Sequence, residues 1–123
     1  MHKTLLPFQH GLLDYATVLA TALAPRVFGF PPKAARLSQT VSAAYLGLSA
    51  VTDYPLAVKR VIPFRTHGSI EFMSGFILPL LPWVVGFAQH RPARSFLLSL
   101  SAITFAVWAL TDWDAPAAKS SEV

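Results

Sequence analysis

The chain has 123 residues, of which 54% are hydrophobic and only 13% are charged, and it contains no cysteine. Ordinary soluble domains carry about 25% charged residues, so this composition favours lipid over water as the solvent and predicts a single membrane domain. The missing cysteines exclude disulfides, iron–sulfur clusters, thiolate zinc sites and thiol nucleophiles. The net charge of +4 comes from basic residues scattered over the connections, which favours contact with anionic lipid headgroups and excludes a nucleic-acid partner.

Four apolar segments follow one another along the chain, at residues 8–28, 35–51, 67–87 and 94–110. Each has roughly 17 to 21 residues, which is the length that crosses a hydrocarbon core as a helix. Helices are required there because an unpaired backbone group in lipid costs several kcal/mol. The sequence therefore predicts an all-α integral membrane four-helix bundle.

Small residues are spaced at helical intervals along the second and fourth segments. Stripes of this kind allow helix backbones to approach closely where no hydrophobic effect drives their association. We expect them to pack the helices together. The stripes consist of Ala43, Gly47 and Ala50, and of Ser95, Ser99, Ala102 and Ala106.

The connections differ in length and content. Residues 30–33 and 88–92 are proline-marked turns, whereas residues 53–66 form a longer link with room for a short interfacial helix. Aromatic residues near the predicted helix ends are typical of a membrane-interface belt. They are Tyr54, Phe64, Trp83, Phe87, Trp108 and Trp113.

An internal repeat is the most specific signal in the sequence. His10-Gly11 and Asp14 recur as His67-Gly68 and Glu71 at an offset of 57 residues, and Pro25, Gly29 and Phe30 recur as Pro82, Gly86 and Phe87. Thr52-Asp53-Tyr54 then matches Thr111-Asp112-Trp113 after an insertion of two residues. These matches predict a duplicated unit: repeat 1 at 8–54, a linker at 55–66, repeat 2 at 67–113 and a disordered tail at 114–123.

Each repeat holds two helices, an even number, so both copies enter the membrane from the same side. This predicts two tandem transmembrane hairpins related by a pseudo-two-fold axis along the membrane normal, and argues against the inverted repeats of alternating-access carriers. The positive-inside rule does not orient the bundle, because Lys and Arg residues are divided five to five between its two sides.

The paired His-Gly and acid, followed by Pro82-Trp83-Val84-Val85-Gly86-Phe87, resemble the SPW-repeat family of small bacterial membrane proteins. The resemblance covers roughly residues 8–113, although the signature tripeptide reads Leu81-Pro82-Trp83 in one copy and Ala24-Pro25-Arg26 in the other. It implies a four-helix protein of the bacterial inner membrane, and it implies no particular activity.

Two pairs of ionisable residues, His10 with Asp14 and His67 with Glu71, lie four residues apart on their helices and at equal depth in the two repeats. Asp53 and Asp112 end the second and fourth segments, on the same side of the membrane. A carboxylate at a helix C-terminus is mildly unfavourable. We therefore expect Asp53 and Asp112 to support the set by pairing with the histidines.

Several interpretations of this set remain open. The favoured one is structural: each histidine pairs with its own carboxylate, or with Asp53 or Asp112, and joins adjacent helices. The alternatives are a divalent metal site made of His10, Asp14, His67 and Glu71, a proton or ion path, and, less well supported, a haem between His10 and His67.

The function that follows from this is a small non-enzymatic membrane protein that packs with itself or with a larger membrane complex. No nucleophile elbow, phosphate loop or HExxH motif is present to support an enzyme. A metal-, haem- or proton-handling protein is the alternative.

Overall fold

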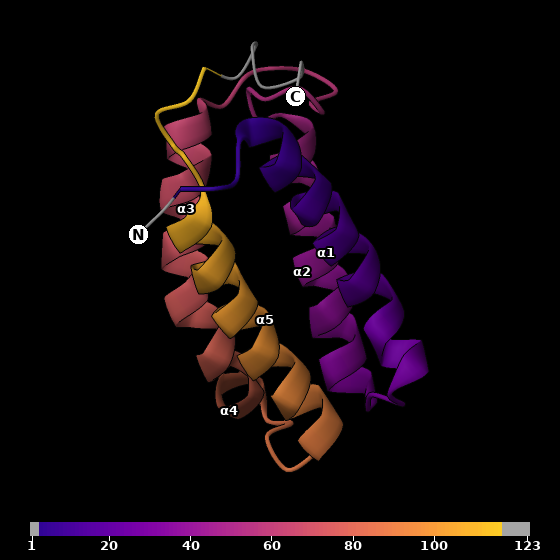
Figure 1. Ribbon diagram of the computed structural model, residues 1–123. Coiled ribbons are helices and arrows are strands. Elements are labelled where there is room, and N and C mark those ends of the chain that lie inside the picture. The colour runs from indigo at the N-terminus through magenta and orange to yellow at the C-terminus, as the bar shows by residue number, and fades with distance from the viewer. Residues whose placement is uncertain (1–2, 117–123) are drawn as a thin grey trace.

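The computed structural model describes residues 3–116, and in this range the protein is all-α with no strand. The helices form four rods, of which the third consists of three consecutive pieces (Figure 1). The elements are α1 (Pro7–Val27), α2 (Pro32–Ala50), α3 (Phe64–Ile77), the short 3-10 helix η1 (Leu78–Leu80), α4 (Leu81–Val85) and α5 (Arg91–Leu110).

The rods pair in chain order as two antiparallel hairpins. α1 packs along α2, and the rod of α3, η1 and α4 packs along α5 (Figure 1). We call the end at which α1 and α3 begin the acidic end, and the end with the α1–α2 and α4–α5 turns the basic end. The basic end carries Arg26, Lys33, Arg36, Arg91 and Arg94.

Both turns at the basic end begin in the same way. Gly29 and Gly86 have positive φ angles of 62° and 97°, a conformation in which glycine carries no Cβ penalty. In each case the amide of the following phenylalanine donates back to a proline carbonyl: Phe30 to Pro25 at 3.0 Å and Phe87 to Pro82 at 2.8 Å. These bonds satisfy carbonyls that a helix end leaves free.

The third rod is not the single helix predicted at 67–87. It begins at Phe64, so that the linker ends at residue 63, and it is interrupted at Leu78–Leu80. Pro79 and Pro82 remove two backbone donors there, which breaks the α-helical hydrogen-bond ladder. α1 contains only Pro25, close to its end, and it continues to Val27.

The segment between α2 and α3 contains no helix, contrary to the interfacial helix considered above. It instead returns to the end of α2, where the Asp53 amide donates to the Ile62 carbonyl at 2.7 Å. The same contact occurs in the other repeat, where the Asp112 amide donates to the Leu5 carbonyl at 2.8 Å. Each repeat therefore holds the last turn of the other repeat with the segment that precedes its own first helix.

The interior is unusually polar. Among the described residues, 12 buried residues are polar or charged and 10 are hydrophobic, whereas large aliphatic and aromatic side chains are exposed along all four rods. The one extended apolar core lies near the basic end, where Ala34 of α2 meets η1, α4 and α5. Its buried members are Ala34, Leu78, Phe87, Ala93, Leu97 and Leu100.

The small-residue stripes do not pack the helices as predicted. Ala43 and Gly47 are exposed on α2, and all four members of the α5 stripe are exposed. The helices are instead joined by serines on neighbouring faces: Ser42 donates to the Val18 carbonyl at 2.8 Å and Ser101 to the Gly75 carbonyl at 2.5 Å. The helical spacing shows that the small residues share one side of each helix, but it does not show whether that side faces another helix.

The predicted aromatic belt is only partly present. Tyr54, Phe64 and Phe87 are buried inside the protein, while Trp83 is 59% exposed. Asp114, at the start of the predicted tail, is described and pairs with Arg65. The rest of the tail, from residue 117 on, lies outside the described residues.

Two of the rods are long and apolar enough to cross a membrane, namely Phe64–Val85 and Arg91–Leu110. In each of them only 28% of the most apolar stretch is buried inside the protein. α1 and α2 do not meet the same criterion, in keeping with the charged and polar residues that they carry.

Candidate metal centre

Four ionisable side chains meet between the two hairpins near the acidic end. His10 and Asp14 come from α1, and His67 and Glu71 come from α3. The histidines are 0% exposed and the carboxylates 3% exposed. The four-residue spacing places each pair on one face of its helix, and the packing of the hairpins turns the two faces toward each other.

Each histidine of the cluster contacts both carboxylates. Nε2 of His10 lies 3.3 Å from Asp14 and 3.2 Å from Glu71, and Nε2 of His67 lies 3.1 Å from both carboxylates. The two Nε2 atoms are 3.4 Å apart. Each carboxylate thus bridges both histidines, and each histidine contacts the acid of the other repeat as well as its own.

The orientation of both imidazoles is determined by threonines at the ends of α2 and α5. Nδ1 of His67 lies 2.7 Å from the Thr52 hydroxyl, and Nδ1 of His10 lies 2.8 Å from the Thr111 hydroxyl. Each hydroxyl donates its own proton to a carbonyl one turn earlier, of Leu48 or Val107, at 2.6 Å.

Each hydroxyl therefore has only lone pairs left for the histidine, so Nδ1 carries the imidazole proton. Both Nε2 atoms are thereby directed into the cluster, toward the two carboxylates.

Tyr54 stabilises one of the two carboxylates. Its hydroxyl donates to Asp14 at 3.1 Å, and Tyr54 is fully buried. Burial, reinforced by the neighbouring charge of Asp14, raises the pKa of the Tyr54 hydroxyl, so this group stays protonated and remains a donor. Trp113 occupies the matching position in repeat 2 and has no hydroxyl to offer Glu71, which makes the two halves of the site chemically different.

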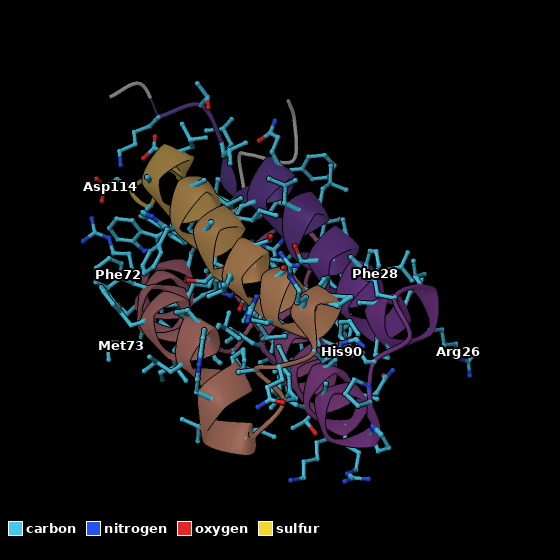
Figure 2. The ribbon with its side chains drawn as sticks, turned by 90° about the horizontal axis from the view of Figure 1, so that it is seen from below. Arg26, Phe28, Phe72, Met73, His90 and Asp114 are labelled. Carbon is cyan, nitrogen blue, oxygen red and sulfur yellow. The ribbon has the colours of Figure 1, made fainter. Side chains whose placement is uncertain are left out.

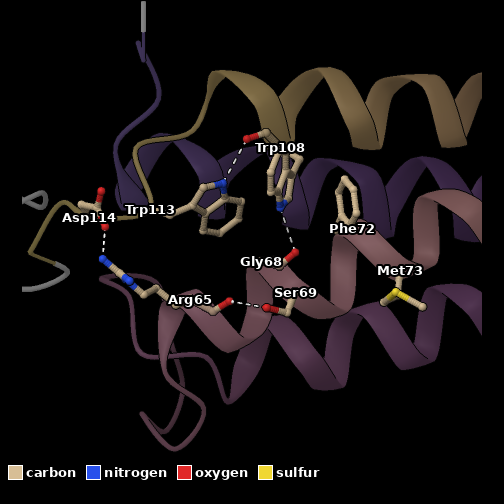
Figure 3. Close-up of a pocket in the computed structure, with 8 residues that line it drawn as sticks. All are labelled: Arg65, Gly68, Ser69, Phe72, Met73, Trp108, Trp113 and Asp114. Carbon is tan, nitrogen blue, oxygen red and sulfur yellow. Dashed lines mark hydrogen bonds and ion pairs between the residues drawn. The ribbon is translucent and has the colours of Figure 1, made fainter.

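Aromatic rings cover the cluster at the acidic end. Trp113 lies edge-on to His10, with ring centroids 4.9 Å apart, and Phe64 packs against Trp113 at 4.6 Å. Figure 3 shows how Trp113 is held: its indole N–H donates to the Trp108 carbonyl at 3.0 Å, and Trp108 donates to the Gly68 carbonyl at 2.9 Å. The rings keep water away from the imidazoles, which strengthens electrostatic interactions inside the site.

A hollow of about 370 Å³ lies outside these rings, between α3 and α5 (Figure 3). Arg65 and Asp114 close its outer rim with an ion pair. None of the four cluster residues lines this hollow, so it is a surface feature beside the site.

Asp53 and Asp112 do not support the cluster as predicted. The Asp53 carboxylate is about half exposed and lies 3.8 Å from Arg60, and the Asp112 carboxylate accepts from the Asp114 amide at 3.0 Å. The residues that contact the histidines are the preceding threonines. Thr52 and Thr111 were already visible as a repeated Thr-Asp pair, but the sequence did not show which member of the pair faces inward.

The spacing of the ligand atoms suits a transition-metal ion. Nitrogen and oxygen ligands about 2.0–2.1 Å from a tetrahedral ion lie about 3.3–3.4 Å apart, and the nitrogen–nitrogen and nitrogen–oxygen separations here are 3.1–3.4 Å. The four ligand atoms all lie within 4.8 Å of one another. Small inward rotations of the carboxylates would close the shell around an ion.

The cluster does not suit a haem. A bis-histidine haem needs its macrocycle to surround the gap between the two imidazoles, and here the carboxylate oxygens of Asp14 and Glu71 occupy the sides of that gap. The hydrogen bonds do not favour a proton path either. From each Nδ1 they lead through a threonine hydroxyl to a backbone carbonyl, which has no proton to pass on.

No protein-family model, curated protein or solved structure matches this chain.

Proposed function

We propose that this chain is a small integral membrane protein whose two transmembrane hairpins are joined by a divalent transition-metal ion held by His10, Asp14, His67 and Glu71. The observation that carries the proposal is the pair of Nε2 atoms, 3.4 Å apart, between two bridging carboxylates. Two neutral imidazoles and two carboxylates form a donor set that suits zinc, iron or manganese, and a divalent cation would balance the two negative charges.

A buried pair of carboxylates is costly unless its charge is neutralised. One additional proton on each histidine would also neutralise the two carboxylates. The cluster would then only join adjacent helices, which is the interpretation that the sequence favours. The threonines support the metal, because they hold both imidazoles with Nε2 directed into the cluster, in the way that outer hydrogen bonds orient metal-ligating histidines.

The membrane location is supported by the distribution of polarity. Serines, threonines and the ionisable cluster make up much of the interior, while many leucine, isoleucine and phenylalanine side chains are exposed. This is the reverse of what a water-soluble protein of this size requires. Four rods in two like-oriented hairpins, with equivalent contacts in both repeats, further support a pseudo-two-fold bundle that is exposed to lipid.

The metal proposal is tested by elemental analysis and by Co²⁺ titration of the detergent-purified protein. We expect about one metal ion per chain and a visible Co²⁺ spectrum typical of mixed nitrogen and oxygen ligands. His10→Ala and His67→Ala should each abolish both. A metal-free protein whose Co²⁺ spectrum is the same in these variants would overturn the proposal.

His90→Ala is the matched control. His90 lies at the start of α5, outside the cluster, and accepts from the Ala93 amide through Nδ1. Its removal should leave the bound metal unchanged. Asp14→Asn, which keeps the size of the side chain, separates loss of a ligand from loss of the fold if the alanine variants prove unstable.

A second function, as an accessory component that packs with itself or with a larger membrane complex, is favoured by one observation. Ala43 and Gly47 on α2, and Ala102 and Ala106 on α5, face outward and contact no other helix of the described chain closely enough to be buried. Crosslinking in native membranes tests this proposal, which a strictly monomeric protein would contradict. Membership of the SPW-repeat-like proteins and location in the bacterial inner membrane remain proposals that rest on the repeated motifs.

A further inference from the structure

An apolar groove of about 490 Å³ lies between α1 and α5. Its walls are formed by Ala20, Leu23, Ala24 and Val27 of α1 and by Ser99 and Ile103 of α5. On the other side of the molecule, the break at η1 brings α4 against α2, and the apolar core fills that interface. α1 has no such break, and a groove remains between its second half and α5.

The groove has the length of one membrane leaflet. Its α1 wall runs from Thr17 to Phe28, which is about 16 Å at 1.5 Å per residue. Its α5 wall, continued by a smaller hollow at Pro92 and Ser95, runs from Ile103 to Pro92 and has the same length. Half of a hydrocarbon core of about 30 Å is 15 Å, so the groove reaches from the basic end to mid-membrane.

Arg91 lies at the basic end of this groove, because the next residue along the chain, Pro92, lines the smaller hollow. Arg91, Ser95 and Ser99 follow at four-residue intervals and therefore share one face of α5, and both serines line the hollows. Arg91 is exposed and forms no ion pair with any residue between 3 and 116.

The surroundings of Arg91 add to its positive charge. Figure 2 views the molecule from the basic end, where Arg26, Phe28 and His90 are labelled. Arg26, Lys33, Arg36 and Arg94 lie at this end as well, and the five acidic residues that the structure describes all lie toward the acidic end. The end of the bundle at which the apolar groove begins therefore carries five Lys and Arg residues and, among residues 3–116, no carboxylate.

We propose that this groove binds an anionic phospholipid, with one acyl chain between α1 and α5 and the phosphate at Arg91. The proposal rests on the membrane location proposed above but not on the metal. The groove length matches one acyl chain in one leaflet, and the charge at its mouth selects an anionic over a zwitterionic headgroup.

The test uses the full-length protein in detergent, freed of lipid and then supplied with phosphatidylglycerol or with phosphatidylcholine of the same acyl chains. Native mass spectrometry counts bound lipid, and a thermal melt records stabilisation. We expect one phosphatidylglycerol per chain and a raised melting midpoint, with at least fivefold weaker binding of phosphatidylcholine. Equal binding of the two lipids would contradict the proposed selectivity for an anionic headgroup.

Two variants locate the site. Ser99→Phe fills the groove and should abolish the stoichiometric lipid, and Arg91→Gln should weaken phosphatidylglycerol binding about fivefold, the effect of one basic residue near a lipid surface. Their controls are Ala102→Phe, on an exposed face outside the groove, and Lys59→Gln, at the acidic end. Undiminished binding in Ser99→Phe would overturn the groove as the site.

A failure of the membrane proposal would be recognised separately. A protein that carbonate washing releases from membranes is not integral, whatever lipid it binds in detergent. Metal content in Ser99→Phe should equal that of the wild type, because Ser99 lies away from the cluster.

Discussion

At the scale of single residues, the orientation of the two imidazole rings depends on Thr52 and Thr111. Each hydroxyl takes part in two contacts at once, with a backbone carbonyl and with an imidazole Nδ1. A threonine outside the site makes the first contact alone, as Thr40 in the middle of α2 does with the Arg36 carbonyl at 2.9 Å. The second contact makes these threonines part of the site.

Thr52→Val and Thr111→Val should each weaken metal binding by roughly 10- to 100-fold, the usual cost of losing a hydrogen bond behind a ligating histidine. The measurement is a competition titration against a chelator of known affinity. Thr52→Ser keeps the hydroxyl and should bind like the wild type. Thr40→Val, which removes the same helix contact without a histidine, should have no effect; equal affinities in all four proteins would contradict the role of the threonines.

Gly68 is required by the close approach of Trp113. A Cβ at residue 68 would lie 2.9 Å from the Trp113 ring, whereas a Cβ at Gly47 would meet nothing within 4 Å. Gly68→Ala should therefore lower the free energy of unfolding in detergent by about 1–3 kcal/mol. Gly47→Ala should be neutral or stabilising by up to about 1 kcal/mol, because alanine is the better helix former. The same loss in both variants would show that packing against Trp113 is not the cause.

At the scale of elements, the helices of each hairpin are held by serine hydroxyls that donate to carbonyls of the neighbouring helix. Ser42 reaches Val18, and Ser101 reaches Gly75, which is the position 57 residues later. The carbonyls are accessible because small residues leave space, as Gly75 does against α5. Hydrogen bonds thus join these helices, whereas contacts between large apolar side chains join the helices of a soluble bundle.

Ser42→Ala and Ser101→Ala should each reduce the free energy of unfolding by about 0.6 kcal/mol, the average for interhelical hydrogen bonds in membranes. Denaturation in mixed detergent micelles measures the change. Ser74→Ala is the control, since Ser74 donates within its own helix to the Ile70 carbonyl and not to another helix. A loss for Ser74→Ala as large as for the other two would show that the interhelical bond is not responsible.

At the scale of the whole molecule, the two repeats are interlocked rather than merely adjacent. The Leu5 and Ile62 segments each hold the end of the other repeat's second helix, and each histidine contacts a threonine and a carboxylate of the other repeat. A metal ion in the cluster would join α1 to α3, and with them the two hairpins. It should therefore stabilise the assembled molecule as a unit.

Metal added at 100 times its dissociation constant should stabilise the protein by about 2.7 kcal/mol, the mass-action value for a ligand that binds only the folded state. The check is the thermal midpoint with and without a chelator. His67→Ala should lose this dependence on metal and His90→Ala should keep it. A thermal midpoint of the wild type that does not depend on the chelator would contradict the metal, and would favour a cluster in which protonated histidines join the helices.

The sequence by itself determined the features that depend on local chemistry and on repetition. Helix lengths follow from the apolar segments, the positions of the turns from Gly29 and Gly86, and the equal depth of His10 and His67 from the offset of 57 residues. The cluster of His10, Asp14, His67 and Glu71 was identifiable for the same reason, because two matching helical faces in a duplicated fold tend to meet.

Only the tertiary structure decided which face of each helix points inward and which residue of a repeated pair makes contact. The small stripes face outward, Thr52 and Thr111 replace Asp53 and Asp112 beside the histidines, and Pro79 and Pro82 break the third rod. Where a helix is apolar around most of its circumference, hydrophobic periodicity does not distinguish an outward-facing side from a side that faces another helix. The inward faces are set by polar groups that must find partners across the bundle, and those partners are distant in sequence.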